Sequence, residues 1–416
     1  MNSECLETDV VIIGAGPSGA IAAAILVNLG HKVTVIEREK FPRFSIGESL
    51  LPQSMEFIEE AGMIDAVKEV NFQFKNGAAF QYKNYQTSFN FTEKFSPGPG
   101  TTFQVRRAEF DKILADEAEK YGAEILYEHT IQSIEFNEGK PLLSFTNAEQ
   151  VSGKITGKFV LDASGFGRVL PRLLDLNTPS DFPPRQSVFT HIEDNILDEN
   201  YDRNKILVTV HPVHADVWLW LIPFPDGRCS LGVVAEPDYI NDFGSECCND
   251  NLTILKTIIN DVPSLKKLLR HAKFDTPVRT IKGYSANVKS LYGEGFALLG
   301  NAGEFLDPVF SSGVTIALKS ASLSAGLLHR QLSGESINWE VEYSDKLMVG
   351  INTFRSFVTA WYDQRFQDII FHDSQVKDIK EMISAILAGY AWDENNPYVA
   401  ESERRINVLA EICRGE

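Results

Sequence analysis

The chain has 416 residues, 44% of them hydrophobic, and acidic residues outnumber basic ones 57 to 39, for a formal net charge of -18. This length exceeds what one compact core usually fills, so we expect two closely packed domains. No run of lysine and arginine could follow a phosphate backbone, which argues against nucleic acid as a partner. The 5 cysteines lack CxxC spacing and predict reduced thiols in a cytoplasmic protein, without a zinc site or disulfides.

The N-terminal segment combines a strand, a turn, a helix and a second strand. Residues 8–13 are β-branched and apolar, strong helix formers run on to Gly30, and KVTVIE follows as a strand. Glycines in the turn let backbone N–H groups and a helix N-terminus approach a pyrophosphate, and an acid after the second strand can accept a hydrogen bond from a ribose. We therefore predict a dinucleotide site, for FAD or NAD, rather than a signal peptide or membrane span. Its expected residues are Gly14, Gly16, Pro17, Ser18, Gly19, Glu37 and Arg38.

Further segments along the chain carry a family resemblance. They read FPRFSIGESLLP from Phe41, VRRAEFDKIL from Val105, VLDASGFGR from Val160, WLWLIP from Trp218 and GNAGEFLDPVFSSGVTIALKSA from Gly300. With the N-terminal fingerprint, they resemble the flavin-dependent halogenases of the phenol and pyrrole type. These belong to the superfamily of FAD-dependent monooxygenases similar to p-hydroxybenzoate hydroxylase, to which the geranylgeranyl reductases are related. The resemblance makes FAD the expected cofactor.

The resemblance also implies a fold of α/β class, α+β overall. We expect a Rossmann-like FAD-binding domain of the glutathione-reductase type over residues 1–75, 101–175 and 276–335. An antiparallel-sheet substrate domain is expected over 76–100 and 176–275, where strand-like segments lie between the FAD motifs. A helical segment over 336–416 follows from a stripe of aromatic residues at helical spacing.

Contacts with FAD beyond the first fingerprint are also implied by the family. The expected residues are Ser45, Ile46, Gly47, Arg106, Asp162, Gly300, Asn301, Pro308, Gly313 and Val314. Arg107 is the alternative to Arg106 as the basic residue near the flavin phosphates. The family generally has Asp where this chain has Asn301, and Asn keeps a carbonyl acceptor for the ribityl chain but loses the charge.

The chemistry implied by the resemblance depends on one lysine. In the halogenases, reduced FAD and O2 oxidise a halide to hypohalous acid, which travels through a tunnel to a lysine that halogenates an electron-rich ring. The matching position in NFQFKNGAAFQY is Lys75, and burial beside Phe72, Phe74 and Phe80 would lower the pKa of its amine. Taken alone, the residues predict an exposed lysine without a role. The resemblance reverses that expectation and makes Lys75 the catalytic residue.

The two tryptophans of WLWLIP are expected to wall the tunnel. Period-two spacing puts Trp218, Trp220 and Ile222 on one face of a strand. In the family reading they keep the organic substrate away from the flavin; an aromatic-rich core strand is the alternative. Ser312 and Gly313 match the positions where backbone N–H groups hold the halide.

Phe310 bears on the substrate, because tryptophan-specific halogenases carry a glutamate at that position to assist deprotonation of an indole intermediate. We therefore expect a phenolic or pyrrolic substrate, either free or tethered to a carrier protein. No second GxGxxG fingerprint follows the first, so reduced FAD is expected from a separate NAD(P)H-dependent flavin reductase. Strand alternation would point His211 and His214 of the segment HPVH to opposite faces, and no cysteine or carboxylate cluster accompanies them, so they are interpreted as structural, with no metal.

Three other functions remain open at this point. The same FAD site could hydroxylate an aromatic ring, or could reduce an isoprenoid double bond as the geranylgeranyl reductases do. The chain could also bind flavin without catalysis, as a carrier or regulatory partner.

Overall fold

The computed structural model describes residues 5–246, 250–373 and 376–415, so the adjacent Cys247 and Cys248 lie outside it. Its centre is a six-stranded sheet in the order β20-β21-β12-β2-β3-β8. The bounds are Tyr292–Gly293 for β20, Phe296–Leu298 for β21, Phe159–Asp162 for β12, Val10–Ile13 for β2, Val33–Ile36 for β3 and Glu124–Leu126 for β8. All neighbours are parallel except β20 and β21. The predicted Rossmann-like sheet is therefore confirmed.

This sheet forms because its strands are apolar on both faces. Every residue of β2 and β12 is buried, as expected for strands covered on both sides. Helix α1 (Pro17–Asn28) packs against α4 (Arg107–Tyr121) and α9 (Ser312–Leu332) over one face. Parallel pairing brings the carboxyl ends of β2, β3 and β12 to one edge, where ligands of such sheets bind.

A second, seven-stranded sheet has the order β18-β14-β17-β16-β15-β5-β6. Its strands are Arg279–Lys282 (β18), Gln186–Glu193 (β14), Arg228–Ala235 (β17), Trp218–Pro223 (β16), Lys205–Val210 (β15), Gly77–Tyr82 (β5) and Tyr85–Asn90 (β6). The sheet was expected to be antiparallel, and its neighbouring strands are, except that β15 pairs with β5 in parallel. Strand β18 lies in the range expected for FAD binding yet pairs with β14. The division into domains stays a prediction, with that strand across its boundary.

Smaller elements complete the fold. A four-stranded sheet is built from Cys5–Glu7 (β1), Ser152–Thr156 (β11), Lys140–Asn147 (β10) and His129–Asn137 (β9). Two-stranded pairs join Gln73–Lys75 (β4) to Thr102–Gln104 (β7), and Asn177–Thr178 (β13) to Asn287–Val288 (β19). The remaining α-helices are Ser54–Glu60 (α2), Ile64–Glu69 (α3), Val169–Leu173 (α5), Pro237–Glu246 (α6), Asn251–Asn260 (α7), Pro263–Leu268 (α8), Lys346–Tyr362 (α10), Arg365–Ile370 (α11), Lys377–Leu387 (α12), Pro397–Ala400 (α13) and Ser402–Arg414 (α14). Short helical turns are Gly165–Gly167 (η1), Gly300–Ala302 (η2), Pro308–Phe310 (η3) and Glu340–Asp345 (η4).

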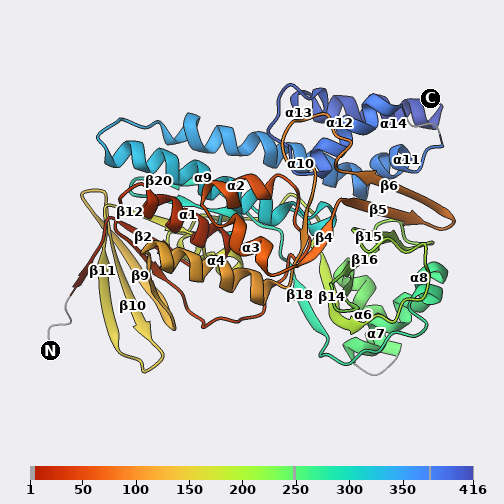
Figure 1. Cartoon of the computed structure of the whole chain (residues 1–416), viewed down its shortest axis with the longest axis horizontal. Coiled ribbons are helices and arrows are strands. Elements are labelled where there is room, and N and C mark those ends of the chain that lie inside the picture. Colours follow the sequence, from red (N-terminus) through yellow and green to blue (C-terminus); the bar gives the residue numbers. More distant parts are fainter. Residues whose placement is uncertain (1–4, 247–249, 374–375, 416) are drawn as a thin grey trace.

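The parallel sheet, the seven-stranded sheet and the C-terminal helices contribute side chains to one hydrophobic core. Figure 1 shows α6, α7 and α8 against the seven-stranded sheet and the C-terminal helices α10 to α14 along one side of the molecule. One cluster of buried side chains runs from Val10 in β2 through Trp218 in β16 to Phe354 and Trp361 in α10. The aromatic stripe of α10 is therefore core, as its spacing predicts. Among the described residues, no helix combines the length and apolar character that a membrane crossing requires.

Candidate cofactor-binding and active site

A cavity of about 420 Å³ lies at the carboxyl edge of the parallel sheet and reaches one face of the seven-stranded sheet. The structure brings most of the predicted site residues into its wall. These are Gly14, Gly16, Pro17, Ser18, Glu37, Arg38, Ser45, Ile46, Gly47, Trp218, Trp220, Asn301, Pro308, Gly313 and Val314. Seven predicted residues do not line the cavity: Gly19, Lys75, Arg106, Asp162, Gly300, Phe310 and Ser312.

The turn between β2 and α1 is shaped for close approach by a ligand. Gly14 has φ of +96°, and a Cβ there would lie 2.7 Å from the carbonyl oxygen of Ala163 in the turn after β12. A Cβ on Gly19 would lie 1.9 Å from the carbonyl oxygen of Gly14, so Gly19 closes the turn from behind. Pro17 begins α1, whose first N–H groups have no partner within the helix. This cradle fits the pyrophosphate of FAD.

The side chain of Glu37, directly after β3, is fixed in place by hydrogen bonds from the backbone. Its carboxylate accepts hydrogen bonds from the backbone N–H groups of Ala15, at 2.8 Å, and Glu39, at 3.0 Å. Because Glu37 is 4% exposed and lines the cavity, it can present an oxygen to a ribose hydroxyl without a change of backbone. The predicted acceptor position therefore fits the adenosine end of FAD.

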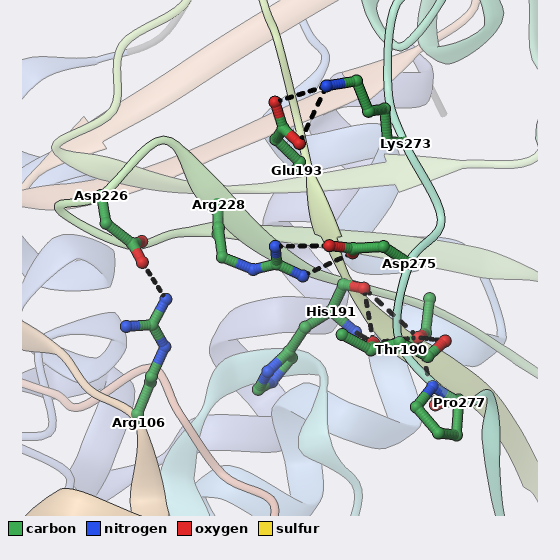
Figure 2. Close-up of polar contacts among 10 residues, drawn as sticks. Arg106, Thr190, His191, Glu193, Asp226, Arg228, Lys273, Asp275 and Pro277 are labelled. Atoms are coloured by element: carbon green, nitrogen blue, oxygen red, sulfur yellow. Dashed lines mark hydrogen bonds and ion pairs between the residues drawn. The ribbon is translucent and has the colours of Figure 1, made fainter.

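Of the two neighbouring arginines, the structure places Arg107 in the cavity wall and Arg106 outside it. Arg107 begins α4 and donates to both carboxylate oxygens of Asp111 and to the carbonyl oxygen of Ile46. Arg106 precedes the helix in extended backbone and forms an ion pair with Asp226 at 2.6 Å (Figure 2). The cavity wall therefore favours Arg107, the alternative, over Arg106 as the basic residue near the cofactor, and the contact itself stays a prediction.

Two further predicted residues shape the site from behind. The buried carboxylate of Asp162 accepts from the backbone N–H groups of Ser164 and Leu170, at 2.9 and 2.6 Å, and so holds the turn after β12. Burial raises the pKa of Asp162. Gly300 has φ of +51° and lets α9 approach, since a Cβ there would lie 2.7 Å from the Cβ of Ala317. Both residues support the cavity without lining it.

The tryptophan face of β16 forms the wall opposite the parallel sheet. Trp218, Trp220 and Ile222 all line the cavity, whereas Leu219 and Leu221 pack into a separate cluster with α7 and α8. The predicted alternation is therefore confirmed. The sequence analysis did not predict how the Trp220 indole is accommodated in the sheet. The neighbouring strand β17 carries Gly232 opposite it, where a Cβ would lie 2.4 Å from the Trp220 ring. An isolated glycine inside the strand pattern CSLGVVA was the available signal.

A chain of buried hydrogen bonds, also missed from the sequence, fixes Trp218. Its indole Nε1 donates to the hydroxyl of Tyr362 in α10 at 3.1 Å, and that hydroxyl donates to Asp307 at 2.7 Å. The second Asp307 oxygen accepts from the N–H of Val309 at 3.0 Å and caps η3. Burial raises the pKa of Asp307 to about 6. One carboxylate thereby positions both the tryptophan wall and the following turn.

That turn presents backbone to the cavity. Ser311 has φ of +58° and lines the cavity together with Gly313, while Ser312 is 2% exposed and lies behind it. Ser312 and Gly313 are the first residues of α9, whose N–H groups are free of helical partners. Phe310 packs edge-on against Phe357, Trp361 and Phe366 and is 4% exposed, so it belongs to the core rather than to the cavity wall.

Lys75 lies behind the cavity and is completely buried. Its Nζ donates to the Ser49 hydroxyl at 2.7 Å and to the Leu50 carbonyl oxygen at 2.6 Å, and Ser49 itself lines the cavity. Burial lowers the pKa of Lys75 to about 7. The amine lies over the ring of Phe91, with the ring centroid 5.4 Å from Nζ, whereas the expected neighbour Phe74 is 44% exposed. One hydroxyl group therefore separates a readily deprotonated amine from the cavity.

The two histidines of HPVH lie close together in the turn after β15. Their rings lie 5.2 Å apart, because the segment turns after β15, and Nδ1 of His211 accepts from the N–H groups of Val213 and His214. The expectation that the strand would point them to opposite faces is therefore wrong. No cluster of three or more metal-binding side chains occurs in the part of the chain that the structure describes.

Known proteins share this fold over nearly the whole chain. A protein family described as FAD binding domain matches residues 7–186. A solved structure described as a flavoprotein/dehydrogenase from Cytophaga hutchinsonii has a TM-score of 0.94 and 41% sequence identity, covering 98% of this chain and 99% of its own. The flavin-dependent brominase Bmp2 has a TM-score of 0.82 and 25% identity, over 99% of this chain and 100% of its own. A 1H-pyrrole-2-carbonyl-(peptidyl-carrier protein) chlorinase of Pseudomonas fluorescens is 28% identical over 389 residues, 86% of this chain and 84% of the relative.

Proposed function

Because this chain belongs to the FAD-dependent flavoproteins that include the flavin-dependent halogenases, we propose that it is a two-component halogenase of an electron-rich phenolic or pyrrolic substrate. The observation that carries the proposal is the position of Lys75. Its buried amine donates a hydrogen bond to the hydroxyl of Ser49, and Ser49 lines the FAD cavity. An exposed lysine would stay protonated and solvated; this one is completely buried, and burial lowers the pKa of its amine to about 7.

In this proposal, each residue has a role that follows from its position in the site. When bound in its reduced form, FAD supplies the electrons with which O2 is activated, and halide is the second co-substrate. Gly313 and the buried Ser312 offer backbone N–H groups at the start of α9 for the halide. Trp218 and Trp220 exclude an organic ring from the cavity. Lys75 polarises or accepts the electrophilic halogen on the far side of Ser49.

The proposed substrate class is supported by Phe310 and by two relatives. An apolar, buried Phe310 provides no base for an indole intermediate, and phenols and pyrroles stabilise the cationic ring through their own heteroatom. One relative is named as a chlorinase and another as a brominase of a pyrrole carried on a peptidyl-carrier protein. A carrier-tethered substrate and a free aromatic one are both consistent with this proposal.

Two further parts of the proposal concern the source of reduced FAD and the location of the protein in the cell. We propose a separate NAD(P)H-dependent flavin reductase as the source of reduced FAD, since the glycine-rich fingerprint at Gly14 to Gly19 serves FAD itself. A cytoplasmic location is supported by the free thiols of Cys5, Cys229 and Cys413.

A flavin dehydrogenase that reduces a carbon–carbon double bond is the second candidate. One observation favours it: a solved structure with 41% identity is described as a flavoprotein/dehydrogenase. Aromatic hydroxylation uses the same site, but the Trp218 and Trp220 rings occupy the wall through which an organic ring would reach the flavin.

The test supplies the FAD-loaded protein with photoreduced FAD, oxygenated buffer and bromide, with phloroglucinol as the phenolic probe. Brominated phloroglucinol, formed only with bromide and lost in Lys75→Met, supports the halogenase. Lys68→Met, at an exposed position of α3, is the matched control and should retain activity. Hydroxylated product without bromide dependence, or reoxidation of reduced FAD by an isoprenoid alkene under nitrogen, would instead establish one of the alternatives.

A further inference from the structure

Glu48 is a buried carboxylate that the proposed chemistry does not use. It is 2% exposed and lines the cavity next to Ser49. Its Oε2 atom is buried without a hydrogen-bond partner in the part of the chain that the structure describes. Buried carboxylate oxygens are normally paired, and leaving one unpaired costs free energy, so this oxygen calls for a partner inside the cavity.

The other oxygen of Glu48 leads toward solvent. Oε1 lies 2.7 Å from Nε2 of His191 in β14, and a carboxylate can only accept, so His191 donates. The His191 side chain is 22% exposed although it is not part of the cavity wall. Figure 2 shows its imidazole beside Arg106 and below the pair of Arg228 and Asp275. The two side chains thus form a bridge from the cavity to the outside.

The charged groups around this bridge are already paired with one another. Those facing it are Arg106 with Asp226, Arg107 with Asp111, Arg228 with Asp275, Lys273 with Glu193, and Arg279 over the Phe44 ring. The ring centroids of Phe44 and Phe224 lie 6.4 and 5.2 Å from that of the imidazole. No lysine or arginine among the described residues forms an ion pair with Glu48, whose partner is His191, so a change of charge inside the cavity acts on the proton between these two side chains.

We propose that Glu48 and His191 carry protons between solvent and the FAD cavity. The pair takes up one proton when bound FAD is reduced and gives it up when FAD is reoxidised by O2. Glu48 is the residue that faces the cofactor, and His191 is the residue that reloads it. The inference rests on the FAD site and holds whether the final product is halogenated, hydroxylated or reduced.

The proton balance follows from the overall reactions. Reduction of FAD to its anionic reduced form uses two electrons and one proton, and the added negative charge draws a second proton onto Glu48. Reoxidation by O2 to FAD and H2O2 consumes one proton, which leaves Oε2 of Glu48. At the next reduction, solvent protonates Nδ1 of His191, Nε2 gives its proton to Oε1 of Glu48, and rotation of the carboxyl brings that proton to the cavity side. Exchange with solvent then moves the remaining imidazole proton from Nδ1 back to Nε2.

The first test is an equilibrium measurement on the FAD-loaded full chain, without halide, O2 or organic substrate. The midpoint potential of bound FAD is measured against pH by spectroelectrochemistry. We expect the wild-type potential to fall by about 60 mV per pH unit near neutrality and that of Glu48→Gln by about 30 mV, since each proton taken up with two electrons adds about 30 mV per tenfold change. The control Glu193→Gln, which changes a carboxylate on the same strand as His191, should keep the wild-type slope. Equal slopes for wild type and Glu48→Gln would overturn the proposal.

The second test keeps Glu48 in place, so it stands even where Glu48→Gln fails to hold FAD. Reduced FAD-loaded protein is mixed with O2 in weak buffer containing a pH indicator, which reports proton uptake beside flavin absorbance. We expect His191→Ala to slow both signals by about tenfold or more, and added imidazole to restore them. Wild-type rates in His191→Ala, or a slowing that imidazole does not relieve, would refute the relay. Neither test uses halide, so failure of halogenation leaves both results interpretable.

Discussion

Replacing Lys75 by Met should change how the stability of the folded protein depends on pH. Burial lowers the pKa of the Lys75 amine from 10.5 to about 7. The unfolded chain therefore holds this proton over a range in which the folded protein has released it. A neutral amine still has two N–H groups for Ser49 and Leu50, so loss of the proton leaves these hydrogen bonds in place.

The size of the effect follows from proton linkage. The lowered pKa corresponds to a preference of the folded protein for the neutral amine of about 5 kcal/mol. Between the two pKa values, stability rises with pH, because the unfolded chain binds the additional proton. From about pH 7.5 to about pH 9, Lys75 should add about 2 kcal/mol to the free energy of unfolding, and Lys75→Met lacks this gain.

The assay is urea unfolding followed by tryptophan fluorescence, with the wild type, Lys75→Met and Lys68→Met measured at both pH values. The difference between wild type and Lys75→Met should change by about 2 kcal/mol across the range, and the difference for the exposed Lys68→Met should stay constant. Parallel curves for wild type and Lys75→Met would mean that Lys75 keeps its proton in the fold. The argument for a neutral catalytic amine would then be lost.

Three other substitutions test the site. Gly19→Ala puts a Cβ 1.9 Å from a backbone oxygen, so we expect a loss of about 2 kcal/mol in stability and weaker FAD binding, measured by thermal denaturation and flavin fluorescence; unchanged affinity would contradict the cradle. Arg107→Ala removes one of the two arginines that pair with the buried Asp111 carboxylate, leaving Arg43, and should destabilise by about 2 kcal/mol, whereas Arg106→Ala should change FAD affinity and stability little; the reverse order would restore Arg106 as the cofactor contact. Tyr362→Phe removes the partner of the Trp218 indole and should cost about 1–3 kcal/mol in urea unfolding; a neutral result would show that this chain of hydrogen bonds does not hold the tryptophan wall.

Much of the site could be predicted because its chemistry is local in sequence. The turn after β2 needs glycine at fixed spacing, and a helix that begins at Pro17 presents its N–H groups wherever the rest of the chain lies. Period-two alternation likewise placed Trp218 and Trp220 on one face, since a strand has no other geometry. Helix starts are less certain, and the one-residue difference between Arg106 and Arg107 decided which side chain entered the cavity.

Contacts between distant segments were beyond sequence reasoning. Glu48 and His191 are 143 residues apart, and Trp218 and Tyr362 are 144 apart. A hydrogen bond between them depends on how the seven-stranded sheet and α10 pack against the parallel sheet, which no local pattern encodes.

The sequence by itself determined the dinucleotide-binding turn, its glycines and the tryptophan face, because each depends on neighbouring residues and on backbone geometry alone. The choice of FAD and the candidate lysine came from the family resemblance. Only the tertiary structure decided that Lys75 is buried behind Ser49, that Phe310 belongs to the core, and that Glu48 has one oxygen without a partner. The physical reason is desolvation: whether a charged group keeps its proton depends on which distant side chains exclude water from it.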